Sequence, residues 1–130
     1  MLQELTIDNL AIIKHLSLDF SDQMTVLTGE TGAGKSIIID AVSLLMGGRG
    51  QTEMIRSGES MAIITGLFEL DDQKEKIAEL CDQYGLPHDD DQLVISRELA
   101  VKGRNVVRIN GQLTTINIWL IFTASMISKF

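Results

Sequence analysis

Cysteine, proline and aromatic residues are scarce in this sequence. Its single cysteine, Cys81, excludes an internal disulfide and a cysteine-ligated metal cluster. With one proline in 130 residues and 45% hydrophobic residues, the chain is neither collagen-like nor disordered. No apolar run is long enough to span a membrane, and no cationic segment followed by an apolar one opens the chain. We therefore expect one cytoplasmic domain with no membrane partner.

Basic residues are also few, and they are unevenly spread. The chain has 11 basic and 18 acidic residues and a formal net charge of −7, which argues against a stand-alone polybasic nucleic-acid binder. Residues 92–130, in contrast, contain one acid, Glu98, and five bases. A solvated hairpin whose charges keep an edge strand soluble is the favoured interpretation, and a phosphate-facing segment is the alternative. The bases that would face phosphates are Arg97, Lys102, Arg104 and Arg108.

Hydrophobic periodicity predicts alternating strands and helices. Apolar residues at every second position, or in short β-prone runs, indicate strands, whereas spacings of three and four indicate helices. The expected strands cover residues 2–7, 16–20, 24–27 and 61–70, with a hairpin made of residues 93–101 and 106–109. The expected helices cover residues 36–46 and 71–84, and a turn is expected at residues 8–9.

One segment carries recognisable chemistry. It reads Gly29, Glu30, Thr31, Gly32, Ala33, Gly34, Lys35 and Ser36, and it matches G-x-x-x-x-G-K-[ST] in full. Glycines let the backbone approach phosphate oxygens, and successive N–H groups then form an anion-binding nest at a helix N-terminus. Lys35 is expected to contact the β- and γ-phosphates, and the Ser36 hydroxyl to ligate Mg²⁺. With a strand before it and a helix after it, the segment predicts binding of Mg-ATP, and no catalytic residue is assigned.

The other candidate residues carry weaker signals. Arg49, just after the helix, is a candidate contact to a nucleotide or DNA phosphate, and an exposed loop arginine without a specific role is the equal alternative. Asp40 is interpreted as structural or as a residue that supports the metal ligands, because the aspartate that holds Mg²⁺ in such sites ends a different strand. Asp71 and Asp72 are typical of a helix start. The run of aspartates at residues 89–91 is interpreted as a solvated loop rather than a cation site, and Cys81 as a packing residue.

Residues 1–115 resemble the N-terminus of the RecN family of bacterial DNA repair proteins, relatives of the SMC-type ABC ATPases. The segments that carry the resemblance are residues 5–13, 27–36, 40–41, 47–49, 55–58 and 109–112. The resemblance implies an α/β P-loop NTPase fold: the N-terminal lobe of an ABC/SMC-type ATPase head, with a mixed sheet, a P-loop helix and an antiparallel β subdomain. It also implies ATP held between two heads, action at DNA double-strand breaks and association with the nucleoid. The implied partners are ATP, DNA, and the C-terminal half of the head or a second head.

The sequence departs from this family in two ways. The coiled coil, the signature loop and the aspartate–glutamate strand of the family are not found, so the chain alone is predicted not to hydrolyse ATP. Residues 116–130 form an apolar tail unlike the family continuation, and a truncated or frame-shifted product is favoured over a genuine buried segment. Two other functions stay open: another P-loop enzyme, for instance kinase-like, and a non-catalytic DNA-contacting module. A guanine-reading N-K-x-D is absent, which disfavours a GTPase.

Overall fold

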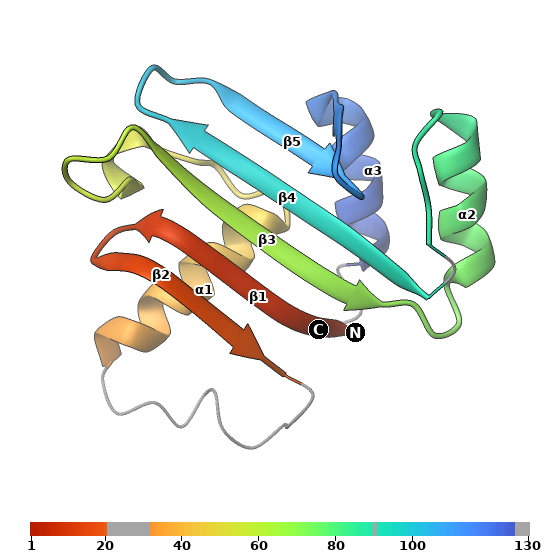
Figure 1. Cartoon of the computed structure of the whole chain (residues 1–130), viewed down its shortest axis with the longest axis horizontal. Helices are drawn as coiled ribbons and strands as arrows, with labels where there is room; N and C mark the ends of the chain where they lie inside the picture. Colours follow the sequence, from red (N-terminus) through yellow and green to blue (C-terminus); the bar gives the residue numbers. More distant parts are fainter. Residues whose placement is uncertain (21–31, 90, 127–130) are drawn as a thin grey trace.

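The described residues form one six-stranded sheet with helices packed against it (Figure 1). The computed structural model describes residues 1–20, 32–89 and 91–126. Within these ranges every strand pairing is antiparallel, in the order β2-β1-β3-β4-β5-β6. The strands are β1 (Leu2–Leu10), β2 (Ile13–Asp19), β3 (Met61–Glu69), β4 (Gln92–Ala100), β5 (Asn105–Ile109) and β6 (Gln112–Thr114). The helices are α1 (Gly32–Leu45), α2 (Lys74–Gln83), α3 (Ile116–Met126) and a short 3-10 helix, η1 (Thr52–Met54).

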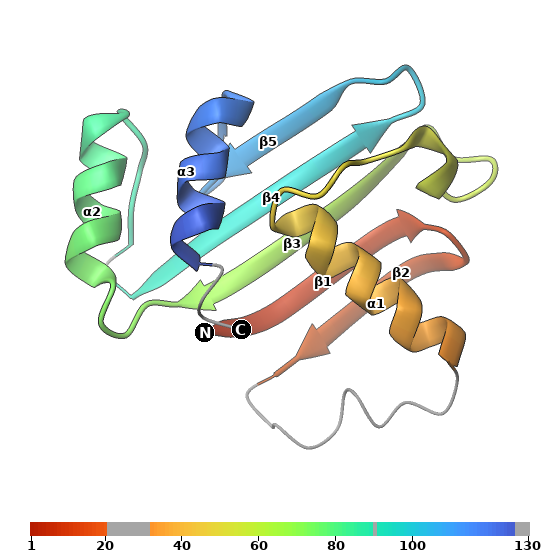
Figure 2. The same cartoon turned by 180° about the vertical axis from the view of Figure 1, so that it is seen from behind.

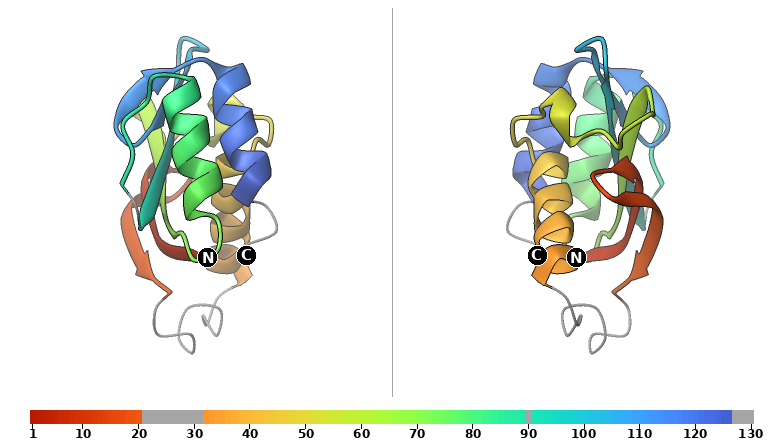
Figure 3. Two further views of the ribbon diagram at one scale, coloured as in Figure 1. Left: turned by 90° about the vertical axis from the view of Figure 1, so that its right-hand side faces the viewer. Right: turned by 90° about the vertical axis from the view of Figure 1, so that its left-hand side faces the viewer.

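Two layers make up the molecule, with the sheet on one side and the helices on the other (Figure 3). Helix α1 contacts β1, β3 and β4, and α3 contacts β5, so the two helices cover the same face of the sheet (Figure 2). Helix α2 follows β3 at the end of the sheet and buries Ile77 and Cys81. One apolar core between the layers therefore holds the described residues together.

In β4, buried and half-buried residues alternate, which shows how the sequence forms this core. Leu93, Ile95, Arg97 and Leu99 point inward and are buried, whereas the residues between them are half-buried on the other face. On the neighbouring strand, Gly66 lets α1 approach closely, because a Cβ at this position would lie 2.4 Å from a methyl group of Leu45. The inner face of the sheet is apolar at all of these positions except Arg97.

The expected strands and helices are confirmed for most of the described residues. The strand at 61–70, the hairpin at 93–101 and 106–109, and both helices are present within a few residues of their expected ends. The turn expected at residues 8–9 is wrong, because β1 continues to Leu10 and the turn lies at residues 11–12. Asp8 instead pairs with His15 across the two strands, with Oδ1 and Nδ1 2.6 Å apart. The strand expected at residues 24–27 lies outside the described residues.

Residues 116–126 of the apolar tail form helix α3 and enter the core. Trp119, Phe122 and Met126 are fully buried, and Thr123 is nearly so. The sequence predicts that the family pattern ends at residue 115 and that the tail begins at residue 116. This boundary stays a prediction. In the described ranges, no helix combines the length and the apolar content that a membrane crossing requires.

Candidate functional site

The G-x-x-x-x-G-K-[ST] motif is described only from its second half. Gly29, Glu30 and Thr31 lie outside the described residues, whereas the backbone from Gly32 to Ser36 forms the start of α1. The first turn of a helix leaves its N–H groups without intrahelical partners, and these groups favour an anion. The side chain of Ser36 is exposed and so open to a ligand. The N-terminus of α1 thus falls within the motif.

Arg49 lies at the other end of α1. The helix ends at Leu45, and Arg49 is exposed in the loop that follows. A helix of this length spans about 20 Å, which is far more than the reach of an arginine side chain. Along the helix, Arg49 is therefore too far away to contact a phosphate bound near Gly32 and Ser36. Any phosphate that Arg49 contacts has to lie at the C-terminal end of α1.

Arg97 is the one buried charged residue among the described residues, at 5% exposure. Its Nη1 donates to the carbonyl of Leu44 at 2.8 Å and to that of Gly48, and its Nε and Nη2 each lie 3.4 Å from Oδ1 of Asn105. Its guanidinium carbon lies 5.6 Å from the ring centroid of Trp119. Burial lowers the pKa of Arg97, yet a guanidinium stays charged at neutral pH. Its charge therefore neutralises the negative C-terminal end of α1.

Two of the four bases that were considered as contacts to phosphates are occupied within the fold. Arg97 is buried under α1 and α3 and is not open to solvent, and Arg108 is paired with the carboxylate of Glu98. Lys102 and Arg104 are exposed at the turn between β4 and β5. Of the four bases, only the two at the tip of the hairpin are presented to solvent without a carboxylate partner among the described residues.

The role of Arg97 is what the sequence reasoning missed. The signal was present, because period-two alternation in β4 places Arg97 between Ile95 and Leu99 on the apolar face. A charge at an inward position needs buried partners, so this pattern alone indicates a structural or positioning role rather than contact with DNA.

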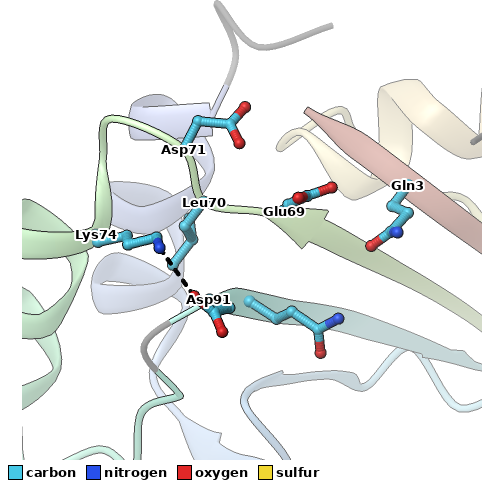
Figure 4. Close-up of a pocket in the computed structure, with 7 residues that line it drawn as sticks. Gln3, Glu69, Leu70, Asp71, Lys74 and Asp91 are labelled. Carbon is cyan, nitrogen blue, oxygen red and sulfur yellow. Dashed lines mark ion pairs between the residues drawn. The ribbon is translucent and has the colours of Figure 1, made fainter.

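A polar pocket of about 660 Å³ opens where β3 ends and β4 begins (Figure 4). Glu69, Asp71 and Asp91 line it together with Lys74, whose Nζ lies 2.9 Å from Oδ1 of Asp91. Three carboxylates against one lysine repel phosphate, so this pocket does not suit a nucleotide. Its acids do not gather into a metal site either: within the described residues, no three metal-ligating side chains lie together.

Cys81 is a fully buried residue of α2, as a packing role requires. Burial, and to a smaller extent the charge of Asp82, raises the pKa of its thiol. The folded state therefore favours the protonated thiol, so the free energy of unfolding is expected to decrease as the pH rises above about 8.5, where the thiol ionises in the unfolded chain.

We also expect Cys81 to react with a chromogenic thiol reagent more than about 100-fold more slowly in the folded protein than in urea. Equal rates in both states would show that α2 does not protect it.

Comparison with known proteins places these features in a family. The model of the AAA domain family matches residues 4–129. The chain is 49% identical over 116 residues to the DNA repair protein RecN of Bacillus subtilis, covering 89% of this chain and 20% of that protein. It is 48% identical over 118 residues to RecN of Halalkalibacterium halodurans, covering 91% of this chain and 21% of that protein. The chain thus spans about a fifth of the length of these relatives.

Solved structures show the same fold. An SMC ATPase structure has a TM-score of 0.73 at 26% identity, over 96% of this chain and 79% of that one. The SMC head domain from Thermotoga maritima has a TM-score of 0.62 at 20% identity, over 99% of this chain and 41% of that one. The expected fold class, an N-terminal lobe of an ABC/SMC-type ATPase head, is confirmed. The chain belongs to the AAA domain family and is similar to the DNA repair protein RecN.

Proposed function

We propose that this chain is the ATP-binding N-terminal part of an ATPase head in a RecN-like protein that acts in the repair and recombination of DNA double-strand breaks. The observation that carries the proposal is the start of α1 within the motif, at Gly32. Free N–H groups of that first turn and the positive end of the helix dipole offer a site for the phosphates of ATP. The DNA repair role comes from the similarity to RecN.

Within this site, each part of the motif is proposed to contact a different part of Mg-ATP. The backbone of residues 29–34 cradles the phosphates, and Lys35 adds a positive charge toward the β- and γ-phosphates. The hydroxyl of Ser36, which is exposed, would ligate Mg²⁺. When bound, the metal neutralises part of the charge of the phosphate oxygens, and the chain's own residues fix the position of the nucleotide.

Hydrolysis and DNA engagement are proposed to need more than this chain. On α1, Ile39 lies three residues after the motif and is 61% exposed, which leaves an apolar position on the helix side that faces away from the sheet. The C-terminal half of the head, or a second head, is proposed to cover that side and to complete the catalytic site. The chain alone is then a nucleotide binder with negligible turnover, located in the cytoplasm with the nucleoid.

Calorimetric titration of the chain with ATP tests the proposal. Binding is expected with Mg²⁺ and is expected to weaken about tenfold in EDTA, because the Ser36 hydroxyl would hold the metal and the metal would offset part of the phosphate charge. Ser36→Ala is expected to remove this dependence on the metal without unfolding the protein, since the side chain is exposed. Ser43→Ala, an exposed serine nearer the far end of α1, is the matched control and is expected to bind like the unaltered chain.

Two outcomes contradict the proposal. If folded protein binds no Mg-ATP even with the complementary half of the head supplied, the phosphate site does not exist. If GTP is preferred, or a phosphoryl group is transferred to a small acceptor, the chain is a different P-loop enzyme.

A further inference from the structure

A mostly apolar groove lies at the end of the sheet where β3 begins and β4 ends (Figure 1). We call it the hairpin groove; its volume is about 470 Å³, and it is lined by residues 58–61, 100–102 and Arg104. Met61 pairs with Ala100 across the two strands, so both side chains point to the same face, the one that α1 and α3 do not cover. A concavity of this size has room for a large side chain of another molecule.

Two apolar side chains of the hairpin groove are open to solvent. Met61 is 36% exposed and Val101 is 54% exposed. Val101 lies in the turn between β4 and β5, a place where polar residues and glycine are usual. Scattered exposed apolar residues are normal, but ones that line the same concavity indicate contact with another molecule.

Backbone hydrogen bonds hold the walls of the hairpin groove in place. The N–H of Val101 donates to the carbonyl of Ser60 at 2.9 Å, which joins the two walls beyond the last paired residues of β3 and β4. Across the turn, the N–H of Gly103 donates to the carbonyl of Ala100 at 2.8 Å, and the N–H of Ala100 donates to that of Arg104 at 3.1 Å. Because the groove is formed before a ligand arrives, little conformational entropy is lost on binding.

The rim of the hairpin groove is basic, in contrast to the chain as a whole. Lys102 and Arg104 are exposed and have no carboxylate partner among the described residues, and Glu59 is the one acid in the lining. Glu98, which lies farther along β4, is paired with Arg108, so its charge is already balanced. The rim therefore has two bases against one acid, whereas the chain has a net charge of −7.

We propose that the hairpin groove docks a short acidic segment of a partner protein, in which a large apolar side chain is flanked by aspartate or glutamate. The apolar side chain fills the groove against Met61 and Val101, and the flanking carboxylates pair with Lys102 and Arg104. An apolar anchor inside a polar rim is the usual arrangement of an interface between proteins. The inference goes beyond the proposed function and does not depend on nucleotide binding.

A protein segment fits this surface better than a DNA backbone does. Affinity for DNA comes mainly from neutralising phosphates, so the apolar walls of the groove would contribute little to it. A duplex carries one negative charge about every 1.7 Å, and the net charge of −7 opposes its approach far more than that of a short peptide with a few carboxylates. The apolar walls and the two bases together therefore favour the peptide.

Fluorescence anisotropy of labelled peptides mixed with the full chain tests the proposal. The probe is a peptide in which one phenylalanine has two glutamates on each side. One reference peptide has alanine in place of the phenylalanine, and the other has glutamines in place of the glutamates. The probe is expected to bind at least about tenfold more tightly than either reference, because it alone supplies both the apolar anchor and the carboxylates. A labelled short DNA duplex is measured in parallel.

Variants of exposed residues locate the binding site. Val101→Ser is expected to weaken binding of the probe about fivefold by removing an apolar wall, and Lys102→Glu about tenfold by reversing a charge at the rim. Leu113→Ser on β6 and Lys76→Glu on α2 are the matched controls, since they change exposed residues of the same kinds elsewhere. Both controls are expected to bind the probe like the unaltered chain, and circular dichroism verifies that all four variants are folded.

Three results overturn the inference. The probe does not bind at concentrations up to about 1 mM, it binds no better than the two references, or Lys102→Glu and Lys76→Glu affect it equally. If the DNA duplex binds, loses affinity in Lys102→Glu and is not displaced by the probe, the surface contacts nucleic acid and the inference is overturned as well. Binding of Mg-ATP depends on the start of α1, so these measurements leave the test of the proposed function separate.

Discussion

Replacing Trp119 by alanine is expected to lower the free energy of unfolding by about 4 kcal/mol, the largest stability effect of any single change considered for this chain. Trp119 is fully buried between α3 and the sheet, and its ring faces the guanidinium of Arg97. Removing the indole leaves a cavity in a core that cannot fully collapse, and it deprives a buried charge of its aromatic neighbour. A domain of this size is expected to melt about 15 °C lower. Urea unfolding followed by circular dichroism measures the change.

Two matched variants show whether the effect comes from the buried ring. Trp119→Phe keeps an aromatic ring, and the indole N–H has no hydrogen-bond partner among the described residues, so the loss is expected to be about 1 kcal/mol. Ile121→Ala on the same helix removes a side chain that is 39% exposed and is expected to cost less than about 1 kcal/mol. If Trp119→Ala unfolds at the same urea concentration as the unaltered protein, α3 is not docked on the sheet. The tail would then be a segment separate from the domain.

Elements with a regular period were predictable from the sequence alone. The alternation of β4 and the apolar runs of β3 and β5 identify strands because each side of the sheet has a different environment. The same alternation places Arg97 inside, but only the fold shows that its partners are carbonyls of α1 and the following loop. Such contacts join residues about 50 positions apart in the chain, and no local pattern encodes them.

The two hairpin turns show where turn chemistry misleads. Asp8 and Asn9 are typical turn residues, yet both lie in β1, whose cross-strand pairing continues to Leu10. Asn9 adopts φ of 57° within the strand, a conformation that asparagine tolerates better than most residues. In contrast, Asn110 and Gly111 form the turn between β5 and β6, with φ of 50° and 83°. Asn-Gly is a strong hairpin signal, so the turn and the strand β6 after it could have been predicted from the sequence.

The sequence analysis did not predict helix α3, because it considered only the apolar composition of these residues. Its residues are mostly apolar, which suggests a tail foreign to the rest of the chain, but the buried positions are Trp119, Phe122, Thr123 and Met126. Spacings of three and four between them are those of a helix face. The period therefore indicated a helix that packs on the sheet, although the composition did not.

The candidate phosphate site depends on the sequence more than on the fold. The motif fixes residue types and spacing because phosphate binding needs backbone amides, a lysine and a hydroxyl group in consecutive positions. The structure adds that α1 begins inside the motif and that Arg49 lies at its far end. The first of these could be expected from the motif, whereas the separation of Arg49 follows only from the length of α1.

Lys35→Ala is expected to weaken binding of Mg-ATP by roughly 30-fold, the effect of removing a charged hydrogen bond to the phosphates. Lys35→Arg is expected not to restore the affinity, because a planar fork does not replace a compact ammonium group against a narrow cradle. Since a ligand that binds only the folded state stabilises it, Mg-ATP at about 100 times its Kd is expected to add about 2.7 kcal/mol to the unaltered chain. The same concentration is expected to add about 1 kcal/mol or less to Lys35→Ala.

The single tryptophan makes this difference measurable in one experiment. Trp119 is buried far from the motif in sequence and reports unfolding by its fluorescence, whether or not nucleotide is present. Without nucleotide, both Lys35 variants are expected to unfold like the unaltered chain, and this control separates a lost phosphate contact from a damaged fold. If Mg-ATP stabilised Lys35→Ala as much as the unaltered protein, the nucleotide would be bound elsewhere. The start of α1 would then be a helix N-terminus that takes no part in binding.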